Sequence, residues 1–196
     1  MVSRPAFEEQ VAATAASISA AVYERAPTLG GGRFVCVDGP AASGKSTLGR
    51  ALARSARQRG SVRLVRIDDL LEGWTGLAGV SARVDRDLVA PLALGGAGRY
   101  RRYDWQRERL AEWRTVEPVD LLVLEGVGSG ASRYADHITT LVWVEAPQDV
   151  RLARGVERDG EAVLPQWLAW MDDEQAEFAR EDTRARADVL VDGALS

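Results

Sequence analysis

The stretch Arg33–Thr47, RFVCVDGPAASGKST, is the strongest indication in the sequence of how the chain folds. It opens with an apolar run, Phe34–Val37, continues through a loop of small residues, and ends where a helical stripe of apolar residues begins. Within it, the pattern G-x-x-x-x-G-K-[ST] is complete, its fixed positions being Gly39, Gly44, Lys45 and Ser46. The stretch therefore predicts a buried strand, a phosphate-binding loop and the start of a helix, in that order.

Each residue type in this pattern has a chemical reason. Glycines let backbone amides approach phosphate oxygens closely, and the amides at a helix N-terminus favour an anion. Lys45 can reach the β- and γ-phosphates of a nucleotide, and the Ser46 hydroxyl can bind Mg²⁺. We therefore expect ATP and Mg²⁺ as cofactors, with ATP bound by the whole loop, namely Gly39, Pro40, Ala41, Ala42, Ser43, Gly44, Lys45, Ser46 and Thr47.

The use of lysine supports this interpretation. The chain has 25 basic residues, and Lys45 is the only lysine among them. A compact ammonium on a flexible stem differs chemically from a planar guanidinium. A chain that uses arginine everywhere else indicates that this one position needs lysine.

Size and composition favour one globular domain over residues 1–196. The chain is 46% hydrophobic, which is ordinary for a protein with a proper core. Its net charge of -4 argues against a protein that coats nucleic acid or an anionic membrane. The single cysteine, Cys36, cannot form an internal disulfide, which fits a reducing compartment.

Two further features concern location in the cell. The N-terminal segment carries Glu8 and Glu9 and has no apolar stretch of the signal-peptide type. No apolar run approaches the roughly 18 residues that a membrane helix needs. We therefore expect a soluble, cytoplasmic protein that acts on a small molecule.

Apolar runs separated by helical patterns predict the fold class. Besides the first strand, four segments are expected to be strands: Val62–Ile67, Val119–Leu124, Leu141–Val144 and Val189–Val191. Strands that alternate with helices form a parallel sheet covered on both faces. The prediction is an α/β protein of the P-loop NTPase fold, with a five-stranded parallel sheet and a small lid at about residues 151–165.

The segment before the first strand, residues 1–26, is predicted to be an amphipathic helix. Phe7, Val11, Ile18 and Val22 recur at spacings that place them on one helical face. We expect this face to pack on the domain. A contact between two copies of the chain, giving a homo-oligomer, is the alternative.

Other segments give coarser expectations. Residues 70–80 contain three glycines and are expected to form a loop, followed by a helix over Ala82–Leu94 that is interrupted or entered near Pro91. Residues 95–110, GGAGRYRRYDWQRERL, are expected to be a substrate-side loop running into a helix. Leu164–Phe178 is predicted to be a long amphipathic helix whose aromatic residues belong to the core.

Carboxylates follow two of the predicted strands. Asp68 and Asp69 come after the second strand, and Glu125 closes the third. In parallel α/β sheets, ligands bind beyond the carboxyl ends of the strands, so these residues are candidates for the site. A helix or turn cap is the alternative role for the aspartates. If they lie within a strand, adjacent side chains point oppositely, and only one of them can face the phosphates.

Several motifs, taken together, resemble the uridine kinase family, within the group of P-loop small-molecule kinases that includes phosphoribulokinase and one type of pantothenate kinase. They are GPAASGKST, IDDL, YDW, VDLLVLEG, DVRLARGVERD and ADVLV. The resemblance extends from about Phe34 to Val191 and so covers most of the chain. It implies an enzyme that transfers a phosphoryl group from ATP to an alcohol.

The resemblance also implies roles for individual residues. Those expected to take part in catalysis are Lys45, Asp68, Arg154 and Arg158, with Asp68 as the base and the two arginines on the lid. Those expected at the metal are Ser46, Asp68 and Glu125. Those expected near the substrate are Asp68, Tyr103, Asp104 and Glu125, with Trp105 in place of a usual phenylalanine.

The sequence departs from the family pattern only on the acceptor side. Leu70 and Leu71 follow the aspartates, and Glu108 stands near the place of a histidine that touches the nucleobase in the family. The resemblance favours a nucleoside such as uridine or cytidine as acceptor. The alternatives are a kinase for pantothenate, a sugar or a nucleoside monophosphate, and a regulatory protein that binds ATP without metabolic activity.

A cluster of arginines suggests a further hypothesis about the acceptor. Its members are Arg99, Arg101, Arg102, Arg107 and Arg109. Guanidinium groups suit phosphate and carboxylate oxygens. On this hypothesis, the acceptor itself carries an acidic group.

Overall fold

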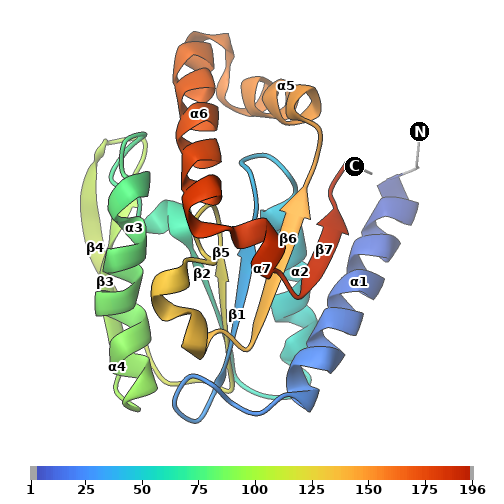
Figure 1. Ribbon diagram of the computed structural model, residues 1–196, viewed down its shortest axis with the longest axis vertical. Helices are drawn as coiled ribbons and strands as arrows, with labels where there is room; N and C mark the ends of the chain where they lie inside the picture. The colour runs from blue at the N-terminus through green and yellow to red at the C-terminus, as the bar shows by residue number, and fades with distance from the viewer. Residues whose placement is uncertain (1–3, 195–196) are drawn as a thin grey trace.

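Five parallel strands form the central sheet in the order β2-β5-β1-β6-β7, as Figure 1 shows. Their bounds are β1 Arg33–Asp38, β2 Val62–Arg66, β5 Leu121–Glu125, β6 Thr140–Glu145 and β7 Val189–Asp192. The computed structural model describes residues 4–194, so the first three residues of the expected N-terminal helix lie outside the described part. The predicted five-stranded parallel sheet is confirmed.

Strand β1 shows how the sheet is covered on both faces. Phe34 and Cys36 belong to one apolar cluster, and Val35 and Val37 belong to another. All four residues are fully buried. Because successive side chains of a strand point to opposite faces, each face of the sheet has its own core.

Helices α1, Arg4–Glu24, and α2, Lys45–Ala56, cover one face. The buried side of α1 consists of Ala15, Ile18 and Val22, which pack with residues of α2 and the sheet. The expected packing of the N-terminal helix on the domain is thus observed. Arg25, just after α1, donates to the carbonyl of Thr139 and to the carboxylate of Asp188, which ties the end of the helix to the residues just before β6 and β7.

The other face is covered by a run of helical segments and by the C-terminal helices. The run consists of α3 Leu77–Val84, a π-helical turn η2 Asp85–Val89, and α4 Ala90–Ala93. The remaining helices are α5 Gln148–Asp159, α6 Leu164–Glu181 and α7 Thr183–Arg186, with short 3-10 turns η1 Ile67–Asp69, η3 Ser132–His137 and η4 Glu161–Val163.

The helical run begins earlier than the sequence suggested. Residues 77–80 were expected in a loop, but Leu77, Val80 and Val84 form a stripe that is buried in the core. The spacing of these apolar residues outweighs the cost of Gly79 inside the helix. Pro91 follows the π-helical turn and lies in the first turn of α4, where its missing N–H matters least.

The predicted loop and helix over residues 95–110 are wrong, because the chain forms an antiparallel hairpin there. Its strands are β3 Gly98–Asp104 and β4 Arg109–Val116. Tyr100 and Val116 are buried in the core, while most of their neighbours are exposed. The carboxylate of Asp104 accepts hydrogen bonds from the amides of Gln106 and Arg107, which closes the turn.

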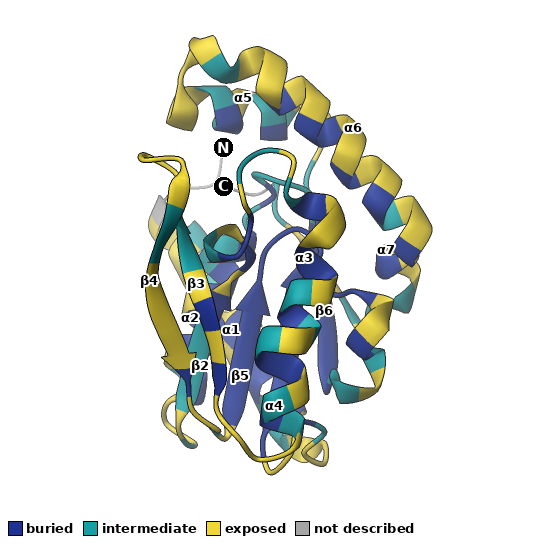
Figure 2. Cartoon of the chain, turned by 90° about the vertical axis from the view of Figure 1, so that its left-hand side faces the viewer, coloured by how far each residue is buried: buried dark blue, intermediate teal, exposed yellow. Residues whose placement is uncertain are grey.

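Figure 2 shows α5 and α6 arching over the end of the sheet, with the hairpin β3–β4 along one side. The carboxyl ends of the parallel strands lie beneath this arch. Among the described helices, none combines the length and apolar character needed to span a membrane.

The end of β1 is tied to the loop after β5 by a buried carboxylate. Asp38 is fully buried and accepts hydrogen bonds from the amides of Gly39, Gly128 and Gly130 at 2.7, 3.0 and 2.7 Å. Burial raises the pKa of Asp38 to about 6, although these amides and Lys45 lower it. One carboxylate therefore positions the start of the phosphate loop against a second loop of the site.

This arrangement predicts a pH dependence of stability. Between the ordinary pKa near 3.8 and the folded value of about 6, the folded state binds the proton that the unfolded state has lost. The contribution of Asp38 to the free energy of unfolding therefore falls as pH rises from about 4 to about 6. Urea denaturation of the native protein and of Asp38→Asn over this range measures the contribution as a difference, in which the other titrating groups cancel.

We expect the native protein to lose stability relative to Asp38→Asn as pH rises through this window. A difference that is constant with pH would show that Asp38 does not titrate there in the folded state.

Candidate active site

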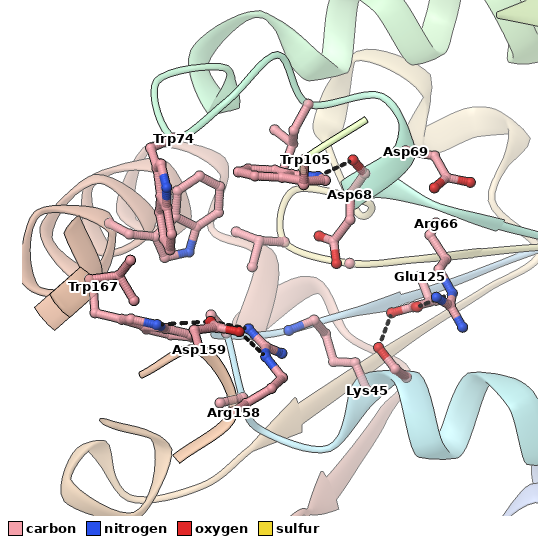
Figure 3. A pocket seen from close by; sticks show the side chains of 18 of the residues that line it. Lys45, Arg66, Asp68, Asp69, Trp74, Trp105, Glu125, Arg158, Asp159 and Trp167 are labelled. Carbon is pink, nitrogen blue, oxygen red and sulfur yellow. Dashed lines mark hydrogen bonds and ion pairs between the residues drawn. The ribbon is translucent and has the colours of Figure 1, made fainter. Parts of the chain in front are cut away.

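A cavity of about 530 Å³ lies at the carboxyl ends of β1, β2 and β5. The phosphate loop and the start of α2 form one side, the residues after β2 and β5 form another, and the hairpin turn and α6 close it. Figure 3 shows Asp68 and Lys45 pointing toward its middle, with Trp74 and Trp167 at one end. This is the edge of a parallel α/β sheet at which ligands bind.

The phosphate loop has the conformation that the motif requires. Gly39, Ala42 and Gly44 have φ values of 134°, 58° and 103°. A Cβ atom at Gly39 would lie 2.0 Å from the carbonyl oxygen of Val144, so only glycine fits. At Gly44, by contrast, a Cβ would meet no atom closer than 3.9 Å, and the N-terminus of α2 has no side-chain cap. The amides at this helix end are available to an anion.

Lys45 is surrounded by carboxylates. Its side chain is buried, and its ammonium donates to the carbonyl of Pro40 at 2.7 Å. Burial lowers its pKa, while Glu174, Glu125, Asp38 and Asp68 act in the opposite direction. Lys45 thus lies where the loop, the strand ends and α6 converge.

Ser46 and Glu125 form the second polar contact of the loop. The Ser46 hydroxyl donates to the carboxylate of Glu125 at 3.1 Å, and Arg66 lies 3.6 Å from the other carboxylate oxygen. Burial raises the pKa of Glu125, followed by the neighbouring Asp68, while Lys45, Ser46 and Arg66 lower it. In the described part of the chain, no group of three or more His, Cys, Asp or Glu residues could hold a metal alone.

Asp68 and Asp69 do not lie in a strand but in the 3-10 turn η1, so the expectation that one must point away does not apply. Both line the cavity. In Figure 3, Asp68 points to the middle, between Trp105 and Lys45, and Asp69 lies at the edge. Asp69 lies close to Tyr100, and burial raises the pKa of Asp69. Asp68 is therefore the carboxylate closer to the phosphate loop.

Four of the six tryptophans line the cavity: Trp74, Trp105, Trp167 and Trp170. The ring of Trp74 contacts the other three edge to face, at centroid distances of 5.8, 6.1 and 6.1 Å. The indole N–H of Trp105 donates to the backbone carbonyl of Asp68 at 2.9 Å. These residues come from three separate segments and together form an aromatic wall opposite the phosphate loop.

Only part of this aromatic wall could be predicted from the sequence. We expected the aromatic residues of α6 to belong to the core, and Trp167 is indeed buried, but it also lines the cavity. Trp74 stands in a glycine-rich segment shortly after the aspartates, and its partly buried indole packs against the core and lines the cavity. That position was the signal available in the sequence.

The arginines of α5 occupy different places. Arg158 lines the cavity, forms an ion pair with Asp159 at 2.8 Å and lies over the ring of Trp167 at 5.5 Å. Arg154 is not among the lining residues and donates to the carbonyls of Ala42 and Gly193 at 3.3 and 3.0 Å. Both therefore adjoin the phosphate loop or the cavity, but only Arg158 faces the cavity itself.

Tyr103 and Asp104 are not among the residues that line the cavity. Tyr103 packs edge to face on Trp105 at 5.4 Å, and Asp104 closes the hairpin turn. Their contact with the site runs through Trp105. The substrate roles expected for Tyr103 and Asp104 stay predictions.

The arginine cluster of the hairpin also lies outside the cavity lining. Arg102 binds Glu112, Arg101 binds the carbonyl of Ala111, and Arg99 lies over Trp113 at 4.5 Å. These contacts stabilise the hairpin. The hypothesis of an acidic acceptor therefore has no support from this cluster.

A second buried carboxylate joins the phosphate loop to the aromatic wall. Glu174 of α6 accepts hydrogen bonds from the amide of Ala41 at 2.7 Å and from the indole of Trp170 at 3.2 Å. Arg151 of α5 forms an ion pair with Glu174 at 2.7 Å and donates to the carbonyl of Ala41. Glu174 is only 2% exposed. Its burial leaves a charge that must be paired within the protein.

We predict that Glu174→Met destabilises the protein by about 3 kcal/mol, because it leaves the guanidinium of Arg151 buried without its partner. Arg151→Met should have a similar effect, and the double variant should cost clearly less than the sum of the two. Urea denaturation measures all three. The exposed ion pair of Arg184 with Glu145 provides the control, since Arg184→Met should change stability little. Additive effects of Glu174→Met and Arg151→Met would contradict the pairing.

The sequence of this chain matches one family of kinases. The model of the phosphoribulokinase/uridine kinase family matches residues 86–190, more than half of the chain. No curated protein sequence matches the chain.

Two solved structures are similar over most of their length. One is a possible uridine kinase from Bacillus stearothermophilus, 20% identical, with a TM-score of 0.66, covering 91% of this chain and 98% of its own. The other is a candidate fructose transport system kinase from Silicibacter sp. TM1040, 20% identical, with a TM-score of 0.64, covering 90% and 98%. At this identity they show the shared fold. With the match of the family model, they establish that this chain belongs to the phosphoribulokinase/uridine kinase family of P-loop kinases.

Proposed function

We propose that this protein transfers the γ-phosphoryl group of ATP to a hydroxyl group of a small molecule that carries a flat ring, with a nucleoside such as uridine or cytidine as the first candidate. The observation that carries the proposal is the composition of the cavity. It joins a phosphate loop, a central carboxylate at Asp68 and an aromatic wall within one cavity.

The aromatic wall favours a nucleoside among the acceptors. Indole faces and edges pack well on flat rings, and two of the four tryptophans, Trp74 and Trp105, are only partly buried. The cations of the lining, Lys45, Arg66 and Arg158, already lie beside carboxylates. Lys45 and Arg158 are assigned to the triphosphate and Arg66 lies beside Glu125, so the described lining offers no further cation to an acceptor with its own phosphate. A sugar is the second candidate, because of the fold shared with the fructose transport system kinase.

The residues present fit ATP and Mg²⁺. The uncapped N-terminus of α2, the open space at Gly44 and the ammonium of Lys45 suit a triphosphate. Ser46 and Glu125 would hold Mg²⁺ through their side-chain oxygens, with Asp68 close by. When bound, Mg²⁺ neutralises charge on the phosphate oxygens during transfer.

In the proposed reaction, the acceptor hydroxyl lies between Asp68 and the end of the triphosphate. Asp68 takes the hydroxyl proton as the oxygen forms its bond to the γ-phosphorus, the bond between that phosphorus and the β-γ bridging oxygen breaks, and ADP leaves. Lys45 and the loop amides hold the phosphates in line. The transition state is loose, so these groups act mainly by positioning and by balancing charge.

Arg158 and Arg154 are assigned to the lid. Arg158 would exchange Asp159 for phosphate oxygens when α5 and α6 close on the ligands, since a guanidinium suits both. Arg154 already holds the loop through the carbonyl of Ala42 and would keep it in shape during closure. Exclusion of water from the closed cavity prevents hydrolysis of ATP.

The test is ADP release from Mg²⁺-ATP with a panel of nucleosides, sugars and pantothenate as acceptors. The proposal predicts that release depends on an added acceptor and is fastest with a nucleoside. Fast ADP release with a sugar alone would support the proposed reaction but identify a sugar, and not a nucleoside, as the acceptor. Release that is independent of any acceptor, or tight ATP binding with no release, would favour a regulatory ATP-binding protein.

We predict that Lys45→Ala lowers kcat by at least about 100-fold, because the variant lacks the ammonium group that balances charge on the phosphates. Lys45 is the only lysine of the chain, so no other lysine can replace it. Lys45→Arg should not restore it, since the longer, planar group does not fit the same pocket. Steady-state kinetics and thermal denaturation of both variants separate lost catalysis from lost folding. A folded Lys45→Ala protein with most of its activity would contradict the assignment.

A further prediction distinguishes the two adjacent aspartates. Asp68→Asn should lower kcat by about 100-fold to 10,000-fold through loss of the base. Asp69→Asn should have a small effect on kcat, because Asp69 lies at the edge of the cavity beside Tyr100. Both substitutions keep the size of the side chain, so each is the matched control of the other. An inactive Asp69→Asn protein beside an active Asp68→Asn protein would reverse the roles.

A further inference from the structure

A second cavity, of about 250 Å³, adjoins the phosphate loop on the side away from Asp68. The loop and α2 contribute Gly44 and Thr47, the segment after β7 contributes Gly193, and the N-terminal helix α1 contributes Phe7, Gln10 and Thr14. Its remaining lining is mostly aliphatic. None of these three residues of α1 belongs to the motifs of the family or to the cavity described above.

The two cavities lie on either side of residues Gly44–Thr47, at the end of the phosphate loop and the start of α2. Lys45 and Ser46 line the first cavity, whereas Gly44 and Thr47 line the second. A triphosphate held at the N-terminus of α2 therefore has one end toward Asp68 and the other toward α1. Because the acceptor and the terminal phosphate occupy the first cavity, the nucleoside of the donor must leave the loop on the other side.

The wall provided by α1 is held firmly in place. Ala15, Ile18 and Val22 are buried in the core of that face, and Arg25 anchors the end of the helix at Thr139 and Asp188. Movement of α1 would expose this apolar surface to water. Val11, which also lines the second cavity, packs against the same core, so this side of the cavity is present before any ligand binds.

The chemistry of the lining suits a nucleobase. Phe7 is partly buried and offers an aromatic ring beside aliphatic side chains, which together pack on a flat, weakly polar ring. Gln10 has one amide that both donates and accepts, and Thr14 and Thr47 have hydroxyls that do the same. Such groups distinguish bases by their polar edges, since an unmatched polar group in a pocket costs binding energy.

We propose that α1 forms one wall of the site for the nucleoside of the phosphoryl donor, with Phe7 packing on the base and Gln10 and Thr14 helping to select it. This inference rests on the proposed function, since it assumes that the loop binds a nucleoside triphosphate. It assigns the N-terminal helix a part in donor binding besides its part in the core.

Equilibrium binding tests the proposal without any acceptor. Titration calorimetry is carried out with a non-hydrolysable ATP analogue and, separately, with inorganic tripolyphosphate, both with Mg²⁺. Phe7→Ala should weaken binding of the ATP analogue by about 10-fold or more, the loss expected for a buried aromatic contact, and should leave tripolyphosphate binding unchanged. Gln10→Ala should change the ratio of affinities for the adenine and guanine analogues.

Two control variants make the result specific. Glu9→Ala changes an exposed residue on the same turn of α1, outside the lining of either cavity, and should affect neither ligand. Ile18→Val loosens the packing of α1 in the core and should affect both ligands equally or not at all. The contrast between the nucleoside and its bare triphosphate thus separates a direct contact from a general change in α1.

The possible failures are distinct. Equal loss of the ATP analogue and of tripolyphosphate in Phe7→Ala, or no loss of either, would overturn the role of α1 and leave the proposed function standing. A native protein that binds neither ligand would overturn the proposed function together with this inference.

Discussion

The shape of the phosphate loop depends on two buried carboxylates that hold its backbone from opposite sides. Asp38 accepts from the amide of Gly39 and from two amides of the loop after β5, and Glu174 accepts from the amide of Ala41. The loop contains residues with positive φ, a conformation that is costly for Ala42. Since such conformations persist only where the surroundings impose them, these hydrogen bonds set the geometry of the amides before any phosphate binds. Preorganised donors of this kind cost no reorganisation at the moment of reaction.

The same carboxylates link the loop to the rest of the site. Asp38 connects it with the glycine-rich segment after Glu125, and Glu174 connects it with Trp170 in the aromatic wall. A shift in the position of α6 would therefore be transmitted to the phosphate loop through the side chain of Glu174. The loop lies between a large charged and aromatic cavity and a smaller apolar one, so the two ends of a nucleoside triphosphate meet different environments. This division gives a physical basis for the separation of donor and acceptor that phosphoryl transfer requires.

The parts of the structure that could be predicted from the sequence are those with local signals. The loop motif, the apolar runs of the five strands and the carboxylates after β2 and β5 are all recognisable within short windows. The hairpin β3–β4 was missed because its basic residues conceal the alternation and only Tyr100 and Val116 contact the core strongly. The contact of Ala41 with Glu174 spans 133 residues, and the aromatic wall joins three segments. No local pattern predicts such contacts, since tertiary packing alone creates them.

In the proposed reaction, the phosphoryl group passes to an organic hydroxyl and not to water. The most direct measurement is a single turnover of the enzyme–ATP complex with the preferred acceptor, in which mass spectrometry counts the phosphorylated acceptor against ADP and inorganic phosphate. The account predicts one molecule of phosphorylated acceptor for each ADP, because the closed cavity places the acceptor hydroxyl between Asp68 and the triphosphate and excludes water. Inorganic phosphate formed in step with ADP, without a phosphorylated acceptor, would contradict it.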